Sequence, residues 1–125
     1  MISAMPSIEE AQAFADDWYE AWNAHDLDRV LSHYREDVRF SSPFVVAITR
    51  SEDGTIVGRP ELARYFARAL EAYPDLRFEP LGLFVGAESV VLHYRSVLGL
   101  LAAELMSLDG DRLVTTAMAH YDRLP

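Results

Sequence analysis

The sequence contains no cysteine and no lysine, and acidic residues far outnumber basic ones. The lack of cysteine excludes disulfide bonds and thiolate-bound metal sites. All eleven basic residues are arginines, and with twenty acidic residues they leave a formal net charge of −9. A chain with this charge repels nucleic acid unless its arginines are clustered, and they are scattered along the sequence. We therefore expect no nucleic-acid partner, and we interpret the exclusive use of arginine as codon bias in a GC-rich bacterial genome.

Long apolar runs are also missing, so we expect no membrane span and no membrane partner. The first residues lack the basic segment of a signal peptide and carry two early glutamates, which favours a cytoplasmic location. Half of the 125 residues are hydrophobic, which is ordinary for a globular protein of this length. These features predict one domain spanning residues 1–125.

Helix signals dominate the first part of the chain. Ser7 followed by Glu10 forms a capping-box pattern, and apolar residues then recur at helical spacing as far as about Asn23. Asp26 is a good N-cap for a short second helix. A third helix is predicted to begin at Arg59-Pro60-Glu61 and to stop before Pro74.

Strand signals dominate the second part. Extended stretches are predicted at residues 76–85, 89–98, 100–108 and 112–121, with glycines at the turns between them. Earlier in the chain, residues 37–42 alternate as a strand should, and residues 44–48 read as further extended chain. Helices followed by a meander of strands predict an α+β fold.

Three segments in this order resemble the NTF2-like superfamily, and within it the SnoaL-like proteins: AWNAHDLDRVLSHYREDVRF, VGRPELARYF and LDGDRLVTTAMAHYD. The resemblance covers essentially the whole chain. It implies an NTF2-like (cystatin-like) cone, in which three N-terminal helices pack on a strongly bent mixed or antiparallel sheet that encloses a pocket. The fold hosts several reactions and also non-catalytic binders, so it implies no single function.

Comparison with the ketosteroid isomerases of this superfamily argues against their particular chemistry. Their general-base aspartate position, just before a proline, is Ser42 here, and their oxyanion-hole tyrosine position is Trp18. Glu104 is the best match to their second, protonated oxyanion donor on a late strand. A serine cannot act alone as such a base, and an indole is a poorer oxyanion donor than a phenol.

The late strands offer a different polar set. A turn at Leu98-Gly99 predicts that His93 lies opposite Glu104 and that Arg95 lies opposite Ala102. His93 is then a candidate base, Glu104 orients its ring, and Arg95 stabilises an anion. The same three residues equally suit a cross-strand salt-bridge network with no catalytic role. Arg95 would also oppose a cation, so we expect no metal, and no cofactor motif is present.

The resemblance also implies which side chains line the cone. The expected pocket is mostly aromatic, with a few polar groups, which suits a small hydrophobic organic molecule. Its expected lining residues are Trp18, Trp22, Tyr34, Phe40, Ser42, Phe66, Val91, Val97, Met106, Thr116, Met118 and His120.

Two functions remain open from the sequence. One is proton-transfer chemistry of the isomerase, cyclase or dehydratase type on the bound molecule, and the other is a non-catalytic ligand-binding or accessory module. Whether the protein is an enzyme is therefore left open. The other face of the sheet, expected to carry Val90, Leu92 and Tyr94, is apolar, which predicts a homodimer formed through that outer face.

Overall fold

The computed structural model describes residues 5–125, so the sequence predictions for the extreme N-terminus fall partly outside the described residues. Within that range the helices are α1 (Ile8–Asn23), α2 (Leu27–Leu31), α3 (Pro43–Thr49), α4 (Arg59–Ala72) and the 3-10 turn η1 (Val97–Gly99). The strands are β1 (Tyr34–Ser41), β2 (Thr55–Val57), β3 (Glu79–Val85), β4 (Ser89–Arg95), β5 (Leu101–Leu108) and β6 (Val114–Tyr121).

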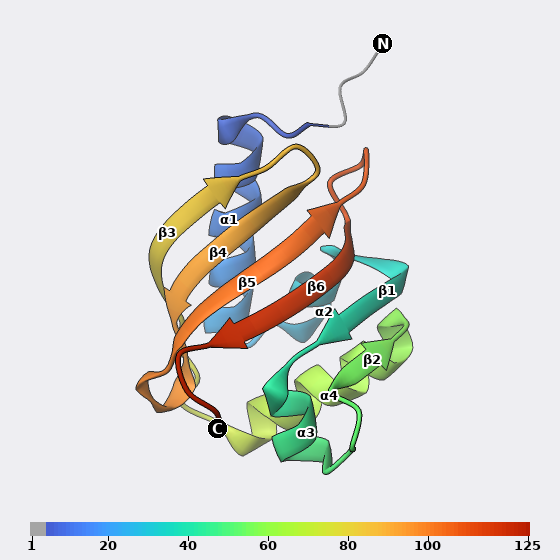
Figure 1. Cartoon of the computed structure of the whole chain (residues 1–125), viewed down its shortest axis with the longest axis vertical. Helices are drawn as coiled ribbons and strands as arrows, with labels where there is room; N and C mark the ends of the chain where they lie inside the picture. The colour runs from blue at the N-terminus through green and yellow to red at the C-terminus, as the bar shows by residue number, and fades with distance from the viewer. Residues whose placement is uncertain (1–4) are drawn as a thin grey trace.

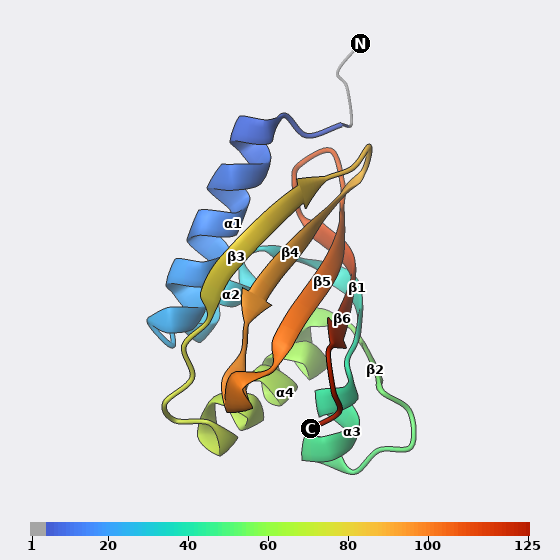
Figure 2. The ribbon, with the colours of Figure 1, turned by 60° about the vertical axis from the view of Figure 1, so that its left-hand side comes forward.

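The strands form one bent, open sheet in the order β2-β1-β6-β5-β4-β3. The β1–β6 pair is parallel and the other pairs are antiparallel, so the sheet is mixed. Helix α1 packs against β3 and α4 packs against β1, both on the concave side. Figure 1 shows the opposite face of β3 to β6 toward the viewer with α1 behind it, and Figure 2 shows the bend. The predicted α+β cone is confirmed.

Helix caps account for the ends of the first two helices. The backbone N–H of Ser7 donates to the Glu10 carboxylate at 3.1 Å, and the Glu10 N–H donates to the Ser7 hydroxyl at 3.0 Å. The Asp26 carboxylate accepts from the Arg29 N–H at 3.2 Å. Both predicted caps are therefore present, and each satisfies N–H groups that a helix leaves open. No helix within residues 5–125 has the length and apolar character needed to cross a membrane.

The segment after β1 corrects one prediction, because residues 44–48 form part of helix α3 and not extended chain. The Ser42 hydroxyl accepts from the Phe44 N–H at 3.1 Å, and Pro43 occupies the first turn, where its missing N–H costs nothing. Ser-Pro is thus a helix start here. The described part of the chain has four α-helices, one more than the sequence predicted.

The β4–β5 register also differs from the prediction. The structure pairs Leu92 with Glu104 and His93 with Ala103, so the expected His93–Glu104 pairing is wrong by one residue. The connection is a three-residue turn, closed by the Ser96 N–H donating to the Leu100 carbonyl at 2.7 Å. Its Leu98 has a φ of 59°. Because side chains alternate along a strand, a one-residue shift moves every side chain of β4 to the other face.

The shift changes the face of the β4 side chains, and the β6 side chains also differ from the prediction. Three β4 residues predicted for the outer face are buried on the concave face: Val90, Leu92 and Tyr94. On β6, the concave residues are the buried alanines at 117 and 119, so the expected pocket residues of that strand alternate onto the outer face: Thr116, Met118 and His120.

Candidate functional site

A cavity lies between the concave face of the sheet and helices α1, α3 and α4. Eight of its lining residues were among the predicted site residues: Trp18, Trp22, Tyr34, Phe40, Ser42, Phe66, Val97 and Glu104. Ten further residues also line it: Phe44, Ile48, Tyr65, Ala69, Tyr73, Leu76, Phe78, Tyr94, Ser96 and Tyr121. The cavity volume is about 50 Å³. A single water needs roughly 10–15 Å³ on the same scale, so the space suits a few waters or one small group.

Aromatic rings make most of the cavity wall, and they hold one another in place. Trp18 stacks on Phe78 with ring centroids 5.6 Å apart, and Trp22 meets Phe66 edge-on at 4.7 Å. Tyr94 packs against Phe78 at 4.7 Å. Such contacts are worth roughly 0.5–1.5 kcal/mol each beyond the area they bury. The wall is therefore rigid and apolar.

Glu104 is the one charged residue that is buried within residues 5–125. Its side chain comes from β5, and one carboxylate oxygen accepts a hydrogen bond from the Tyr94 hydroxyl at 2.6 Å. Burial raises the pKa of Glu104 from 4.5 to about 7, and the Tyr94 hydrogen bond offsets part of that rise. A carboxyl group with this pKa takes up and releases a proton near neutral pH.

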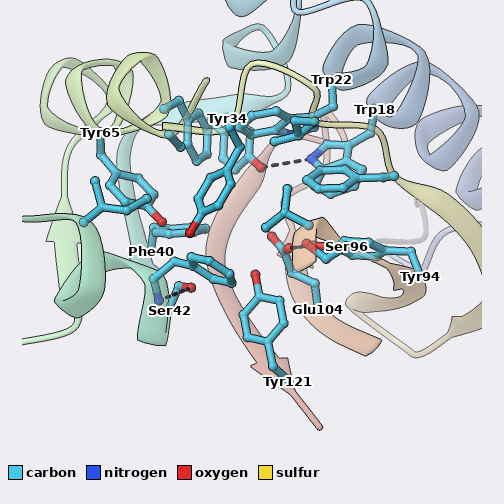
Figure 3. A pocket seen from close by; sticks show the side chains of 18 residues that line it. Trp18, Trp22, Tyr34, Phe40, Ser42, Tyr65, Tyr94, Ser96, Glu104 and Tyr121 are labelled. Carbon is cyan, nitrogen blue, oxygen red and sulfur yellow. Dashed lines mark hydrogen bonds between the residues drawn. The ribbon is translucent and has the colours of Figure 1, made fainter. Parts of the chain in front are cut away.

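Five tyrosines line the same space: Tyr34, Tyr65, Tyr73, Tyr94 and Tyr121. Burial raises the pKa of four of them, most strongly at Tyr34 and Tyr94 and also at Tyr65 and Tyr121, and the nearby Glu104 carboxylate raises it further. These four phenols therefore remain protonated as hydrogen-bond donors, and Tyr94 already donates to Glu104. Figure 3 shows the Tyr121 hydroxyl and the Glu104 carboxylate directed toward the same part of the cavity.

The two cavity tryptophans differ in whether the indole N–H has a hydrogen-bond partner. The Trp18 indole N–H donates to the Tyr34 hydroxyl at 3.0 Å, which leaves the Tyr34 proton free to point elsewhere. The Trp22 indole N–H is buried and has no hydrogen-bond partner among the described residues. A buried donor without a partner costs about 1–3 kcal/mol, and an acceptor on a bound molecule could remove that cost.

The predicted partners of Glu104 lie on the other face of the sheet. His93 is half-buried, with its Nδ1 2.9 Å from the Ala102 carbonyl, and Arg95 is exposed and 3.6 Å from Glu79. Neither residue lines the cavity, so His93, Arg95 and Glu104 are not brought together there. The cause is the three-residue β4–β5 turn.

The remaining predicted pocket residues also lie elsewhere. Val91 is on the outer face with the β6 residues already described, and Met106 is fully buried in the core without lining the cavity. Sequence reasoning missed Tyr94 and Tyr121 as cavity residues. The signal that could have found Tyr94 is the parity of the β4–β5 turn, because Tyr94 pairs with Ala102 and shares a face with Glu104.

Ser42, at the position matching the isomerase base, has a structural task. It is buried, and its hydroxyl caps α3. Within residues 5–125 no group of three or more histidine, aspartate or glutamate side chains is placed to hold a metal ion. The chemistry that the cavity residues themselves offer is proton exchange at one carboxyl group and hydrogen-bond donation from phenols and an indole.

Comparisons with known proteins agree with this architecture. Residues 15–123 match the model of the SnoaL-like domain family. A solved structure of a SnoaL-like protein of unknown function from Burkholderia thailandensis is 40% identical with a TM-score of 0.90, and the match covers 95% of this chain and 99% of that chain. No curated protein sequence gives a match.

More distant solved structures share the fold. A proposed ketosteroid isomerase from Kribbella flavida is 19% identical with a TM-score of 0.72, and the match covers all of this chain and 84% of that chain. A proposed polyketide cyclase from Sinorhizobium meliloti is 12% identical with a TM-score of 0.71, and the match covers 86% and 94% respectively. At these identities the likeness concerns the fold alone.

Proposed function

The chain belongs to the SnoaL-like domain family, and we propose that it binds a small apolar organic molecule in the aromatic cavity and transfers a proton on it through Glu104. The observation that carries the proposal is a buried carboxyl group with a pKa of about 7 among protonated phenols. Apolar walls with a few converging polar groups are typical of small-molecule sites.

The proposed reaction starts from a carbonyl compound. The Glu104 carboxylate takes a proton from the carbon next to the carbonyl, and the electron pair of the broken C–H bond moves onto the carbonyl oxygen. The hydroxyl of Tyr34 or Tyr121, or the Trp22 indole N–H, donates to that oxygen as its negative charge develops. Glu104 then returns the proton to the same or a neighbouring carbon, so no co-reactant is needed.

This assignment replaces the roles expected for His93 and Arg95. Both side chains lie outside the cavity. Glu104 keeps a place in the chemistry, but as the group that carries the proton and not as an orienter of histidine. Tyr94 is a positioning residue, because it holds the Glu104 carboxylate through a 2.6 Å hydrogen bond.

Non-catalytic binding of the same class of molecule is the second candidate. It is favoured by Ser42, which matches the isomerase base position but caps α3 through its hydroxyl. A ligand-binding module needs the aromatic wall and the hydrogen-bond donors, but it does not need proton exchange at Glu104.

Hydrogen–deuterium exchange on a simple ketone separates the two candidates. We expect the protein to accelerate exchange of the α-protons of acetone, a ketone small enough for the cavity, in D₂O, followed by proton NMR, with a rate that rises as Glu104 ionises near pH 7. Glu104→Gln should lower that rate by about a hundredfold or more. Binding is followed separately through the fluorescence of Trp18 and Trp22, the two tryptophans of the chain, which both line the cavity.

Glu71→Gln on the exposed face of α4 is the matched control and should leave the exchange rate unchanged. Binding without accelerated exchange would establish the second candidate. Exchange that survives in Glu104→Gln would remove Glu104 from the mechanism.

We also propose that a second copy of the chain covers the open face of the sheet. Figure 1 shows that none of the described helices covers β3 to β6 on this side. A row of apolar side chains crosses these four strands, formed by Phe84, Val91, Leu105 and Met118. Phe84 is 63% exposed and Met118 is 38% exposed.

Charge also favours this face over the rest of the surface. The chain carries a net charge of −9, so two copies repel each other at most orientations. The open face instead carries Arg39, His93 and His120 beside the apolar row. Contact through this face keeps the acidic surfaces of the two copies apart.

A further inference from the structure

A larger surface cleft adjoins the cavity. The cleft has a volume of about 410 Å³ and lies between the segment after α4 and the β4–β5 turn. It shares four lining residues with the cavity: Tyr73, Leu76, Ser96 and Val97. Figures 1 and 2 show the end of α4 and the β4–β5 turn at the same end of the molecule. The cavity and the cleft therefore lie side by side and share part of their walls.

The cavity and the cleft differ in chemistry. The cavity is lined mainly by aromatic side chains and includes no arginine, lysine or histidine. The cleft is lined by two charged side chains, Asp75 and Arg77, both exposed. Arg77 forms no side-chain hydrogen bond or ion pair within residues 5–125. An arginine without a partner is a natural contact for an anion.

Two further arginines contact carbonyl groups of the β4–β5 turn. Arg123 donates to the Leu98 carbonyl at 2.9 Å, and Arg95 approaches the Gly99 carbonyl at 3.5 Å. The carboxylate that faces Arg95 is Glu79, at 3.6 Å. Neither of these two arginines lines the cleft, so Arg77 is the arginine placed to contact a bound anion there.

We propose that the ligand is an amphipathic carboxylate whose apolar end enters the cavity and whose anionic end rests in the cleft against Arg77. This inference rests on the proposed function and adds the polarity and orientation of the bound molecule. The small inner volume admits only one end of such a molecule, so the remainder lies in the cleft. The Asp75 carboxylate repels the anion and so weakens its binding.

Two probes of matched length test the proposal: hexanoate and its uncharged counterpart hexanamide, whose alkyl end is narrow enough for the cavity. Binding of each is measured by calorimetry and by the fluorescence of the two cavity tryptophans. Arg77→Gln should weaken hexanoate binding by roughly three- to tenfold and leave binding of the amide unchanged. Asp75→Asn should strengthen hexanoate binding, and both effects should shrink at high salt. Arg50→Gln, an exposed arginine outside the cleft, is the matched control.

The outcomes separate this inference from the proposed function. Equal loss of both probes in Arg77→Gln, or no loss of either, overturns the anionic contact while leaving the cavity as a binding site. Failure of both probes to change the tryptophan fluorescence of the unmodified protein overturns the proposed function and this inference together.

Discussion

Replacing Glu104 with glutamine should remove a pH-dependent loss of stability that arises when this buried carboxyl group ionises. In the folded protein the pKa of Glu104 is about 7, against an ordinary value of 4.5. Between these two values the folded state holds a proton that the unfolded state has released, so the free energy of unfolding falls as the pH rises. The cost is absent below about pH 4.5 and complete above about pH 7.

The size of the effect follows from the shift. Each unit of pKa corresponds to about 1.4 kcal/mol, so the ionised Glu104 costs the fold about 3 kcal/mol at alkaline pH. Glutamine has nearly the same shape, keeps an oxygen that can accept from Tyr94, and cannot ionise. Glu104→Gln should therefore gain about 3 kcal/mol of stability relative to the unmodified protein between about pH 5 and about pH 8. In a chain of this length that is on the order of 10 °C in melting temperature.

Urea unfolding followed by tryptophan fluorescence measures the free energy of unfolding of each protein at about pH 5 and at about pH 8. The control is again Glu71→Gln, whose stability should follow that of the unmodified protein. If the difference between the Glu104→Gln variant and the unmodified protein does not change with pH, then Glu104 is not buried in the way described, and its use as a proton carrier near pH 7 has no basis.

Two further predictions concern the partner of Glu104 and the open sheet face. Tyr94→Phe removes the hydrogen bond that lowers the pKa of Glu104, so the Glu104 titration should move to higher pH. NMR of the labelled carboxyl carbon follows this titration. An unchanged titration would contradict the 2.6 Å contact. Met118→Asp places a carboxylate in the apolar row, so sedimentation analysis should show a dimer converted to a monomer with an unchanged melting curve, whereas a monomeric unmodified protein would refute the dimer proposal.

Local signals in the sequence were enough for the fold. The Ser7 and Asp26 caps and Pro74 act within one or two turns of chain, and each helix end they predict is present. The Ser42-Pro43 start of α3 is equally local, but the sequence pattern predicts a strand end there, because the same residues follow β1 directly. Short apolar stretches such as residues 44–48 carry too little periodicity to distinguish a helix from a strand.

The candidate site was harder to predict because it depends on one turn. The sequence placed Trp18, Tyr34 and Glu104 among the site residues, and all three line the cavity. It also placed His93 there, and this depended on counting a two-residue turn where the chain uses three. The three-residue turn requires positive φ at Leu98, a conformation that leucine rarely adopts, so composition alone favoured the wrong register.

The parallel pairing of β1 with β6 has a consequence for how the protein folds. These strands come from opposite ends of the chain, and Phe40 lies beside Ala117 in the finished sheet. The loop between them must close before that pairing can form, which slows folding. During synthesis, β1 must wait for the last strand to leave the ribosome, so its apolar residues stay accessible to chaperones until then. Loss of β6 would therefore separate the β2–β1 pair from strands β5, β4 and β3.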